Sequence, residues 1–565
     1  MLDPSSREKK PSYMPWVLLG LAVVAAIAYG IFTMVIKKYE EKAATIEDAR
    51  MALASRAHKT MVPALEALRA LESDEKEVQD LETALTWVLY AQDGIIPASG
   101  PPKGDELNGV SDRSSVPMVI ARAQRDVLLG EIDGGLRFMK QTLDKNNKEP
   151  SYAEAYARLA LARAESHPGD IALAERAVKG YYDTQMVLDG ASEREFPLSK
   201  AVVQAGYARA NALAGNKEGA LNNFIAAAKS DKNYLWAALY RDMASIPPES
   251  DSVAADQTLK KLLEANKALM SPRQQCAVHV ERARWALQGM DFNARAAALK
   301  EGAEADSTCA EARIQLGVLQ LDLGHVQEAL TQFQAARRIA PNDPRLLYGR
   351  ALAMLDRGDL NALRSMMASL SESDAKSVEA RLIRTRIALA EGNIEEARKE
   401  VDGAKRWSPD AFEVHHVDAL VKAAEGDAKA AAEALNNLIG KARSSGRGAL
   451  GVVLQAEAAA LERNAKKLEA ARGPAEFNEN WRALTLIADG MLHVKRPKMG
   501  KTAEEILRAV VKNSDLPMAR IVLADVLSHK KDGKAEALEL ATKAKSECRS
   551  GPMCARIDEI LKSLQ

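Results

Sequence analysis

Apolar and polar residues recur along this chain with two periods, the helical one and a longer one of 34 residues. The longer period is marked by four glycines, each followed by a polar residue: Gly324-His325, Gly358-Asp359, Gly392-Asn393 and Gly426-Asp427. Glycine ends a helix at little cost because it adopts positive φ, and a polar residue favours the start of the next helix. The pattern therefore predicts helical hairpins that turn at each glycine.

The second helix of each predicted hairpin carries an apolar stripe in the same phase. Its members lie five, nine and twelve positions after each glycine: Ala329, Phe333 and Ala336; Leu363, Met367 and Leu370; Ala397, Val401 and Ala404; Ala431, Leu435 and Leu438. Residues spaced by four and by three share one face of a helix. One hairpin cannot bury that face alone, so the copies are expected to stack on one another.

This pattern resembles the tetratricopeptide repeat family, whose unit is a helix–turn–helix of 34 residues. Residues 310–343 fit best, with Leu316, Gly317, Gly324, Ala329, Phe333, Ala336 and Pro341 on the family's consensus positions. The family's tryptophan and tyrosine positions hold Arg313 and Gln320, so even this unit is degenerate. Weaker copies precede and follow it, and eight to eleven hairpins are expected in all.

We therefore expect an all-α fold, an α-solenoid of tetratricopeptide-like repeats with one N-terminal transmembrane helix. Runs of alternating apolar and polar residues, typical of strands, are absent. The segments 235–272 and 450–515 are helical by pattern but off register. The expected organisation is an N-terminal tail (1–14), a transmembrane helix (15–37), a juxtamembrane helical stalk (38–92), a linker loop (93–115), a degenerate array (116–309), in-phase repeats (310–443) and a C-terminal helical array (450–565).

The N-terminal apolar segment is long enough to span a bilayer. Residues 16–36 form a run of 21 without a charged side chain, about 31 Å long as a helix. Tyr13, Trp16 and Tyr39 are placed like interfacial anchors. A cleavable signal peptide is the alternative, with a cleavage motif ending at Ala28. The apolar run continues beyond that motif, which favours an uncleaved anchor.

The four cysteines lie as two local pairs, Cys276 with Cys309 and Cys548 with Cys554. The first pair falls near the starts of neighbouring repeats, and the second flanks a loop rich in turn residues. Two disulfides in an oxidising compartment are the favoured interpretation, and four unpaired thiols are the alternative. Lys and Arg are nearly balanced around the apolar segment, so they do not decide topology. We expect an inner-membrane protein with repeats in a bacterial-type periplasm, and a cytoplasmic side stays open.

Nothing in the sequence indicates catalysis, a metal site or a cofactor. Residues 495–502 resemble a phosphate-binding loop but lack its opening glycine and a preceding strand, so a basic interhelical loop is expected there. His415 and His416 are adjacent in a helix and cannot share a metal, so both are expected at the surface. Lys plus Arg equals Asp plus Glu at 78 each, which argues against nucleic acid. No small-molecule substrate is indicated.

The family resemblance implies a concave groove lined by the first helix of each repeat. Projected onto this chain, the candidate groove residues are Ile314, Val318, Leu321, Tyr348, Leu352, Leu355, Leu382, Arg386, Leu389, His416 and Leu420. The lysine and asparagine with which chaperone-binding members hold a carboxylate are missing. The strip would suit an amphipathic helix or an extended peptide. The alternative is that these residues pack against neighbouring helices or the chain's own C-terminal part.

The favoured function is a non-catalytic, membrane-anchored protein–protein interaction scaffold of a bacterial envelope complex. Secretion, motility, translocon-associated chaperoning and envelope assembly are all compatible with it. In architecture the chain resembles bacterial single-pass membrane proteins that carry tetratricopeptide arrays, and the expected partners are other proteins or peptides. The alternative is a cytosol-facing adaptor that recruits an enzyme or chaperone to the membrane.

Overall fold

The computed structural model describes residues 14–98, 100–167, 169–190, 196–371, 374–444, 446–494, 496–548 and 551–564. Within these ranges the regular elements are helices and no β-strand occurs, which confirms the predicted all-α class. Tyr13 and almost all of the predicted tail (1–14) lie outside the described residues.

The N-terminal elements are α1 (Met14–Ser55), α2 (His58–Ala70), α3 (Lys76–Asp93) and the short 3-10 helix η1 (Gly104–Leu107). Consecutive helix pairs follow: α4 (Val116–Leu129) with α5 (Ile132–Lys145), α6 (Pro150–Ser166) with α7 (Ile171–Gly190), α8 (Lys200–Leu213) with α9 (Lys217–Ser230), α10 (Leu235–Ala244) with α11 (Ser252–Asn266), α12 (Pro272–Gln288) with α13 (Phe292–Ala305), and α14 (Ala310–Leu323) with α15 (Val326–Arg337). The stack continues with α16 (Pro344–Asp356) and α17 (Leu360–Ala368), η2 (Asp374–Lys376), α18 (Val378–Ala390) and α19 (Ile394–Trp407), α20 (Phe412–Ala424) and α21 (Ala428–Ser444), α22 (Gly448–Leu461) and α23 (Ala465–Phe477), α24 (Trp481–Leu492) and α25 (Pro497–Asn513), and α26 (Pro517–Ser528) and α27 (Lys534–Glu547), and it ends with α28 (Pro552–Leu564).

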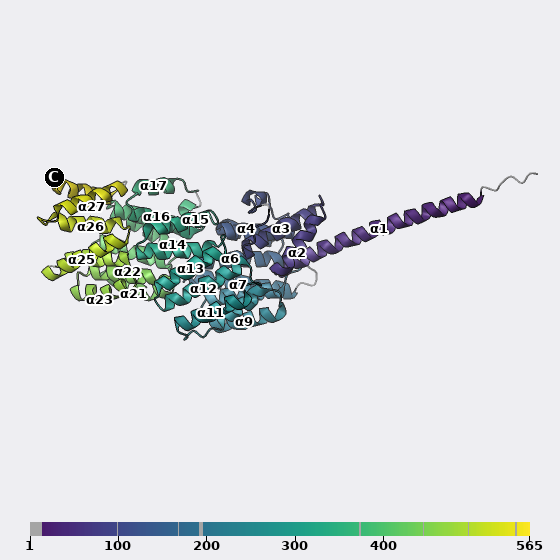
Figure 1. Cartoon of the computed structure of the whole chain (residues 1–565), viewed down its shortest axis with the longest axis horizontal. Helices are drawn as coiled ribbons and strands as arrows, with labels where there is room; N and C mark the ends of the chain where they lie inside the picture. Colours follow the sequence, from purple (N-terminus) through teal and green to yellow (C-terminus); the bar gives the residue numbers. More distant parts are fainter. Residues whose placement is uncertain are drawn as a thin grey trace, which may run out of the picture.

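Helix α1 projects from the repeat stack as one unbroken helix (Figure 1). Apolar side chains such as Val24 and Phe32 are about 60% exposed, which is unfavourable in water and suited to lipid. The helix is long and apolar enough to cross a membrane, although an N-terminal signal sequence meets the same criteria. Beyond the apolar run, residues 37–48 would hold the repeats about 18 Å from the end of the span.

The base of α1 is built into the body of the protein. Ala49 and Leu53 are fully buried in the cluster that α2, α3 and α4 form. Lys42 pairs with Glu75 at 2.6 Å at the edge of this cluster. At the end of α1, the Arg56 guanidinium donates to the buried Glu154 carboxylate of α6 at 2.6 Å. Helix α1 is therefore rigidly joined to the repeats.

The packing differs from two predicted boundaries. Helices α2 and α3, assigned to a stalk (38–92), bury Leu81 and Leu85 against α4 and so begin the repeat stack. The predicted linker (93–115) buries Leu107 and Val110 on the same cluster. Burial of these apolar side chains offsets the conformational entropy that is lost when the loop is ordered. The loop therefore packs on the cluster as a helix would.

The predicted glycine turns have the expected backbone geometry. Gly324, Gly358, Gly392 and Gly426 all adopt positive φ between α-helices, as the 34-residue spacing predicts. The stripe of the second helix also packs as expected. Phe333 fills the space above two glycines, since a Cβ on Gly317 or Gly349 would lie 2.7 or 2.6 Å from its ring. Small residues therefore let the helices of adjacent hairpins approach.

Between α4 and α27 the described part of the chain forms eleven packed hairpins, at the upper end of the expected number. Helices α10 and α11 are consecutive but do not pack as a hairpin, because α10 packs on α9 and α11 packs on α12. The segment 450–515, read as off register, forms two of the hairpins, α22 with α23 and α24 with α25. These hairpins lack the 34-residue phase but keep the amphipathic spacing that stacking requires.

The repeat stack winds back on itself, so that loops of later hairpins touch turns of earlier ones. We call these contacts the seam. It joins Gly94 with Asp306, Gly130 with Asp343, His167 with Glu379, Gly324 with Leu516, and Gly358 with Cys548. Hydrogen bonds across it link residues far apart in the chain, such as Val326 with Asp515 (189 positions) and His167 with Glu379 (212 positions). That separation is about six repeat lengths, the length of one superhelical turn here.

Candidate interaction surface

The predicted concave strip does not form an open apolar groove. Five of its eleven residues are buried: Ile314, Leu321, Tyr348, Leu382 and His416. The other six are partly exposed: Val318, Leu352, Leu355, Arg386, Leu389 and Leu420. The strip runs along the first helices α14, α16, α18 and α20, as the family resemblance implied, but most of its apolar surface is already covered.

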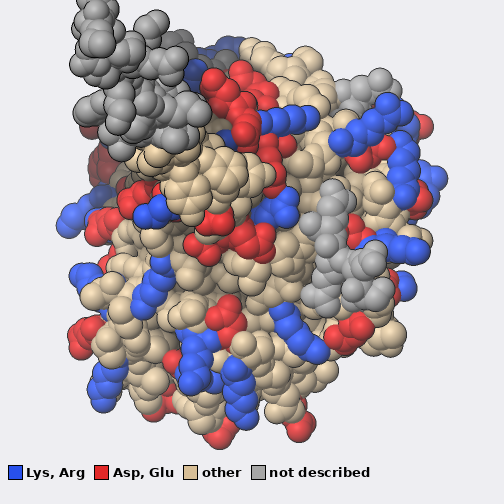
Figure 2. Space-filling view, turned by 90° about the vertical axis from the view of Figure 1, so that its right-hand side faces the viewer, with Lys and Arg blue, Asp and Glu red and all other residues tan. Residues whose placement is uncertain are grey.

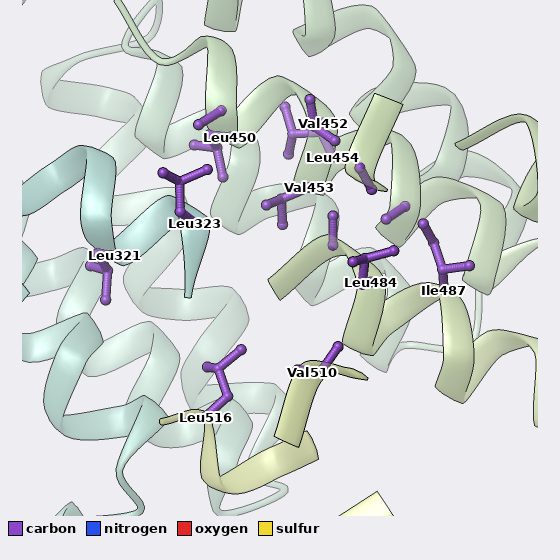
Figure 3. Close-up of a cluster of buried hydrophobic side chains, with 14 of the residues drawn as sticks. Leu321, Leu323, Leu450, Val452, Val453, Leu454, Leu484, Ile487, Val510 and Leu516 are labelled. Atoms are coloured by element: carbon purple, nitrogen blue, oxygen red, sulfur yellow. The ribbon is translucent and has the colours of Figure 1, made fainter. Parts of the chain in front are cut away.

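The C-terminal array covers part of the strip. Leu321 and Leu323 of α14 belong to one buried cluster with Leu450 to Leu454 of α22, Leu484 of α24 and Leu516 (Figure 3). Helix α14 packs directly against α22 and α24. Of the two interpretations of the strip, this packing favours contacts within the chain. Leu382 is only 2% exposed, so Leu382→Asp would damage the fold rather than report on a partner.

Polar residues of four successive first helices form a hydrogen-bonded ladder along the strip. Arg386 Nε donates to the Tyr348 hydroxyl at 3.1 Å, and Arg386 Nη2 lies 3.5 Å from His416 Nδ1. His416 Nε2 lies 3.2 Å from Glu457 Oε2 on α22. Burial alone would raise the pKa of Glu457, but the charge and hydrogen bond of His416 outweigh it and lower that pKa. His416 is thus a buried structural residue, contrary to the surface position expected.

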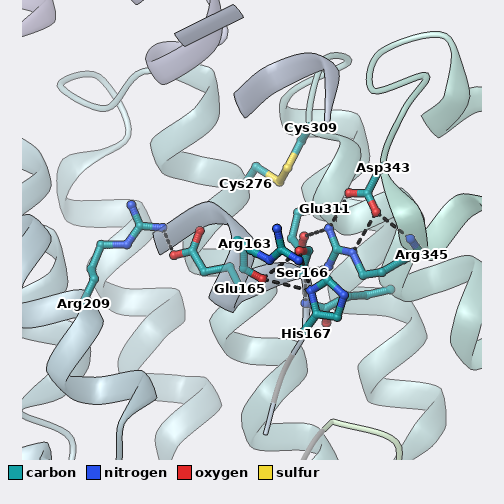
Figure 4. A network of polar contacts seen from close by, with 11 residues as sticks. Arg163, Glu165, Ser166, His167, Arg209, Cys276, Cys309, Glu311, Asp343 and Arg345 are labelled. Carbon is teal, nitrogen blue, oxygen red and sulfur yellow. Dashed lines mark hydrogen bonds and ion pairs between the residues drawn. A yellow bond between two sulfur atoms is a disulfide. The ribbon is translucent and has the colours of Figure 1, made fainter. Parts of the chain in front are cut away.

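A second polar network lies nearer the N-terminal half of the interior (Figure 4). Arg345 pairs with Glu311 and with Asp343, both at 2.8 Å. His167 Nε2 lies 3.0 Å from Glu379 Oε1 across the seam. Burial disfavours the charged form of His167, yet the hydrogen bond and charge of Glu379 raise its pKa overall. These charges are matched within the chain and are not offered to a ligand.

Ion pairs also fasten the C-terminal array to the in-phase repeats. Arg447 binds Asp322 at 2.7 Å, and Arg482 binds Asp356 at 2.5 Å. The Asp515 carboxylate accepts the backbone N–H groups of Val326 and Gln327 at 3.0 and 2.8 Å, and so caps α15 from a distant loop. The C-terminal array (450–565) is therefore in direct contact with the in-phase repeats.

Both cysteine pairs are bonded in the structure. Cys276 of α12 is joined to Cys309, which immediately precedes α14. Cys548, which follows α27, is joined to Cys554 of α28. The first disulfide therefore links neighbouring first helices, and the second links the last hairpin to the terminal helix. No free cysteine occurs in the described residues.

The structure brings no catalytic constellation together among the described residues. Gly500, Lys501 and Thr502 lie inside α25, so most of the phosphate-loop lookalike is helix rather than the interhelical loop expected. Its first residue, Lys495, lies outside the described part of the chain. The described residues contain no group of three acidic, histidine or cysteine side chains placed to hold a metal.

Two aromatic residues on the outer surface were missed by the sequence reasoning. Trp407 and Phe477 are 73% and 81% exposed. They are the last residues of α19 and α23, second helices of hairpins two units apart, so they lie at the same edge of the stack. Trp407 lies three positions beyond the end of the apolar stripe at Ala404. Aromatic residues make up only 5% of the chain, so an aromatic side chain outside the apolar stripe was the signal that could have identified Trp407.

The surface charges are mixed. The face from which α1 projects shows Lys and Arg interspersed with Asp and Glu over a largely uncharged surface (Figure 2). Elsewhere in the structure, ion pairs such as Lys42 with Glu75 match charges of opposite sign. The visible face therefore carries no large field of one sign that would attract nucleic acid.

Comparison with known proteins adds the following. No protein-family model and no curated protein matches the sequence. Among solved structures, the Cut9–Hcn1 hetero-tetramer of the APC/C matches with a TM-score of 0.35 and 13% identity, covering 80% of this chain and 96% of that one. Yeast Tom70 matches with a TM-score of 0.27 and 13% identity, covering 79% and 94%. The chain is an all-α, tetratricopeptide-like helical repeat protein with one long apolar N-terminal helix.

Proposed function

We propose that this protein is a non-catalytic, membrane-anchored scaffold that binds other proteins through the outer surface of its repeats. The observation that carries the proposal is the combination of stacked hairpins with a rigidly joined apolar helix. Stacked hairpins offer an extended surface for protein partners, and the helix would hold that surface at a fixed height above a bilayer. The interior ion pairs, such as Arg345 with Glu311, are matched within the chain, and this supports the non-catalytic assignment.

The repeats are proposed to face an oxidising compartment, in a bacterial-type envelope. Disulfides persist in such compartments and are rare in the cytosol. Both bonds lie at contacts between elements, where loss of a bond would weaken the stack. The alternative is a cytosol-facing adaptor, in which the four cysteines would be thiols.

The side of the membrane can be tested on the native chain. Cells are quenched in acid, free thiols are alkylated, and the mass of the purified chain is measured. We expect no alkylation before reduction and four alkylated cysteines after it. Four alkylated cysteines before reduction would support the cytosolic adaptor instead.

Trp407 and Phe477 are the proposed partner contacts, because exposed aromatic side chains supply much of the binding energy at interfaces. Both are almost free of packing, so Trp407→Ala combined with Phe477→Ala should leave the fold unchanged. Partners are captured by crosslinking in intact membranes before purification. We expect the double variant to recover at least about tenfold less of the main crosslinked protein, since each lost contact costs more than about 1 kcal/mol.

A matched control is available on α7. Tyr182 and Met186 are 52% and 58% exposed and lie on one face of that helix. Replacement of both by alanine removes a similar exposed apolar area away from the proposed contacts. Recovery of the partner should be unchanged. Equal losses in the two variants, or no loss in either, would reject the outer edge at Trp407 and Phe477 as the binding surface.

A further inference from the structure

Trp407 and Phe477, the proposed partner contacts, mark the two ends of one short stretch of the outer surface. Trp407 ends α19, Phe477 ends α23, and the second helix between them is α21. A cleft of about 570 Å³ is lined by Glu433 of α21 and Lys467 of α23, so these two helices are neighbours. They lie toward the end of the molecule away from α1 (Figure 1). We call the surface between Trp407 and Phe477 the aromatic row.

The two ends of the aromatic row differ in charge. The last turns of α19 and α21 contain four basic residues: Lys405, Arg406, Lys441 and Arg443. Arg406 and Arg443 are exposed. The last turn of α23 contains no basic residue but holds Glu476, and Glu479 follows in the loop. The row is therefore basic toward Trp407, even with Asp410 in the loop after α19, and acidic toward Phe477.

The acidic end is unfavourable within a single chain. The C-terminus of a helix carries a partial negative charge, which repels the carboxylates of Glu476 and Glu479. Glu476 is compensated by Arg472 of the same helix at 2.6 Å. Glu479 is exposed and holds a positive φ of 49°, which costs a residue other than glycine free energy. A cation brought to this end from another molecule would offset the repulsion, and an apolar surface beside it would cover Phe477.

We propose that a second copy of this chain covers the aromatic row, in a twofold-symmetric pair in which Trp407 of each copy packs on Phe477 of the other. This rests on the proposed function and names the partner of its binding surface. A twofold axis through the middle of the row makes the two rows antiparallel, because each contact then occurs twice. The basic end of one copy therefore faces the acidic end of the other, with Arg406 against Glu479.

The same axis accounts for the middle of the row. Helix α21 lies on the axis, so Arg443 of each copy stands between the acidic end of its own chain and that of the other copy. Opposite charges on both sides offset the approach of the two arginines to each other. An axis along the long direction of the molecule also places both α1 helices in one membrane (Figure 1). Two chains anchored in one membrane meet at high effective concentration, which favours pairing through a small surface.

Exchange of charges between two copies tests this arrangement. Full-length chains with two different tags are expressed together, and the second tag is measured after purification of the first from solubilised membranes. Native copies should purify together. Copies that all carry Arg406→Glu, or that all carry Glu479→Arg, should give at least about tenfold less, because like charges then face each other in both contacts.

The decisive sample combines the two variants in different copies. One copy carries Arg406→Glu and the other Glu479→Arg, so each of the two contacts again joins opposite charges, and recovery should return to the native amount. Damage to the fold of either variant would not be repaired in this way. Arg137→Glu reverses an exposed charge on α5 and should leave recovery unchanged.

Three results would overturn the proposal: native copies that do not purify together, single variants that pair as well as the native chain, or a mixture that does not recover. The proposed function is judged separately by Trp407→Ala with Phe477→Ala. If that variant still loses its crosslinked protein while native copies do not purify together, the surface binds a different protein, and the second copy alone is rejected. If neither loss nor pairing occurs, both proposals fail.

Discussion

Asp93 is a carboxyl group buried where α3 meets the repeat stack. Its Oδ1 accepts from Trp236 Nε1 at 3.1 Å and from Ser271 Oγ at 3.2 Å, while Oδ2 has no hydrogen-bond partner. Burial raises the pKa of Asp93 to about 7, in spite of these donors and of Arg273. The neutral acid is therefore the form that fits the folded protein.

The sign of the pH dependence follows from that shift. The folded state binds the proton up to about pH 7, and the unfolded chain releases it near 3.8. Stability from this group is therefore complete below about pH 4 and is lost as the pH rises towards 7. Asp93→Asn keeps an acceptor for Trp236 and Ser271 without the charge. We expect its melting temperature to exceed that of the native chain at pH 8, this advantage to be smaller at pH 5, and the advantage to vanish only below about pH 4.

Glu154 is a second residue whose loss should be costly, because it compensates the buried Arg56 and the partly buried Arg158. Its carboxylate lies 2.6 Å from Arg56 and 2.7 Å from Arg158. Glu154→Gln leaves both cations without a counter-charge, and a destabilisation of about 3–5 kcal/mol is expected. Glu165→Gln is the control, since the pair of Glu165 with Arg209 is about one-third exposed and should contribute about 1 kcal/mol or less. Thermal unfolding of both variants, followed by circular dichroism, checks this; similar losses would contradict it.

At the scale of elements, the seam makes some glycine turns less replaceable than others. Gly130 and Gly215 both follow a first helix and both have positive φ. A Cβ on Gly130 would lie 2.4 Å from the backbone nitrogen of Asp343, whereas one on Gly215 would meet nothing within 4 Å. Alanine at Gly215 should cost about 1–2 kcal/mol of backbone strain. Alanine at Gly130 should cost clearly more, because the α15–α16 loop must move.

The melting temperatures of Gly130→Ala and Gly215→Ala measure that difference. The Asn342 backbone amide donates to the Leu129 carbonyl at 2.9 Å. Hydrogen exchange of this amide shows whether the loss of stability arises at the contact between the turn and the later loop. We expect this amide to be less protected in Gly130→Ala only. Equal effects of the two substitutions would mean that the turn at Gly130 is not held by the later loop.

Local features of the fold could be predicted from the sequence, because they repeat and act over a few residues. The turn at Gly324 and the stripe through Phe333 depend on φ preferences and on helix periodicity, which one repeat contains in full. The 34-residue repeat phase is absent from α22 to α25. The hairpins there have only the amphipathic spacing of apolar residues. The aromatic residue at Trp407 lay outside the periodic pattern and so was not singled out.

At the scale of the whole molecule, the path of the stack could not be derived from the sequence. Each repeat turns slightly on its neighbour, and small rotations accumulate over about six repeats before distant loops meet. Whether Leu321 faces a groove or a packed interior depends on that accumulated rotation, because α22 and α24 pack against α14. His416 is different, because its partner Glu457 lies only 41 positions away on the next first helix. The residues of the strip lie on the first helices α14, α16, α18 and α20, but which of them are buried could not be foreseen from the sequence.

The central claim is that late hairpins close on early ones, and disulfide trapping across the seam tests it most directly. Asn342 Nδ2 donates to Glu131 Oε1 at 3.2 Å although the residues are 211 positions apart. Oxidation of the full chain carrying Glu131→Cys and Asn342→Cys should therefore form a new intrachain disulfide in nearly every molecule, detected by mass after proteolysis. In an extended row of hairpins, with helices packed about 8–10 Å apart, these positions would lie roughly 50 Å apart. Absence of the crosslink under conditions that preserve the two native disulfides would contradict the account.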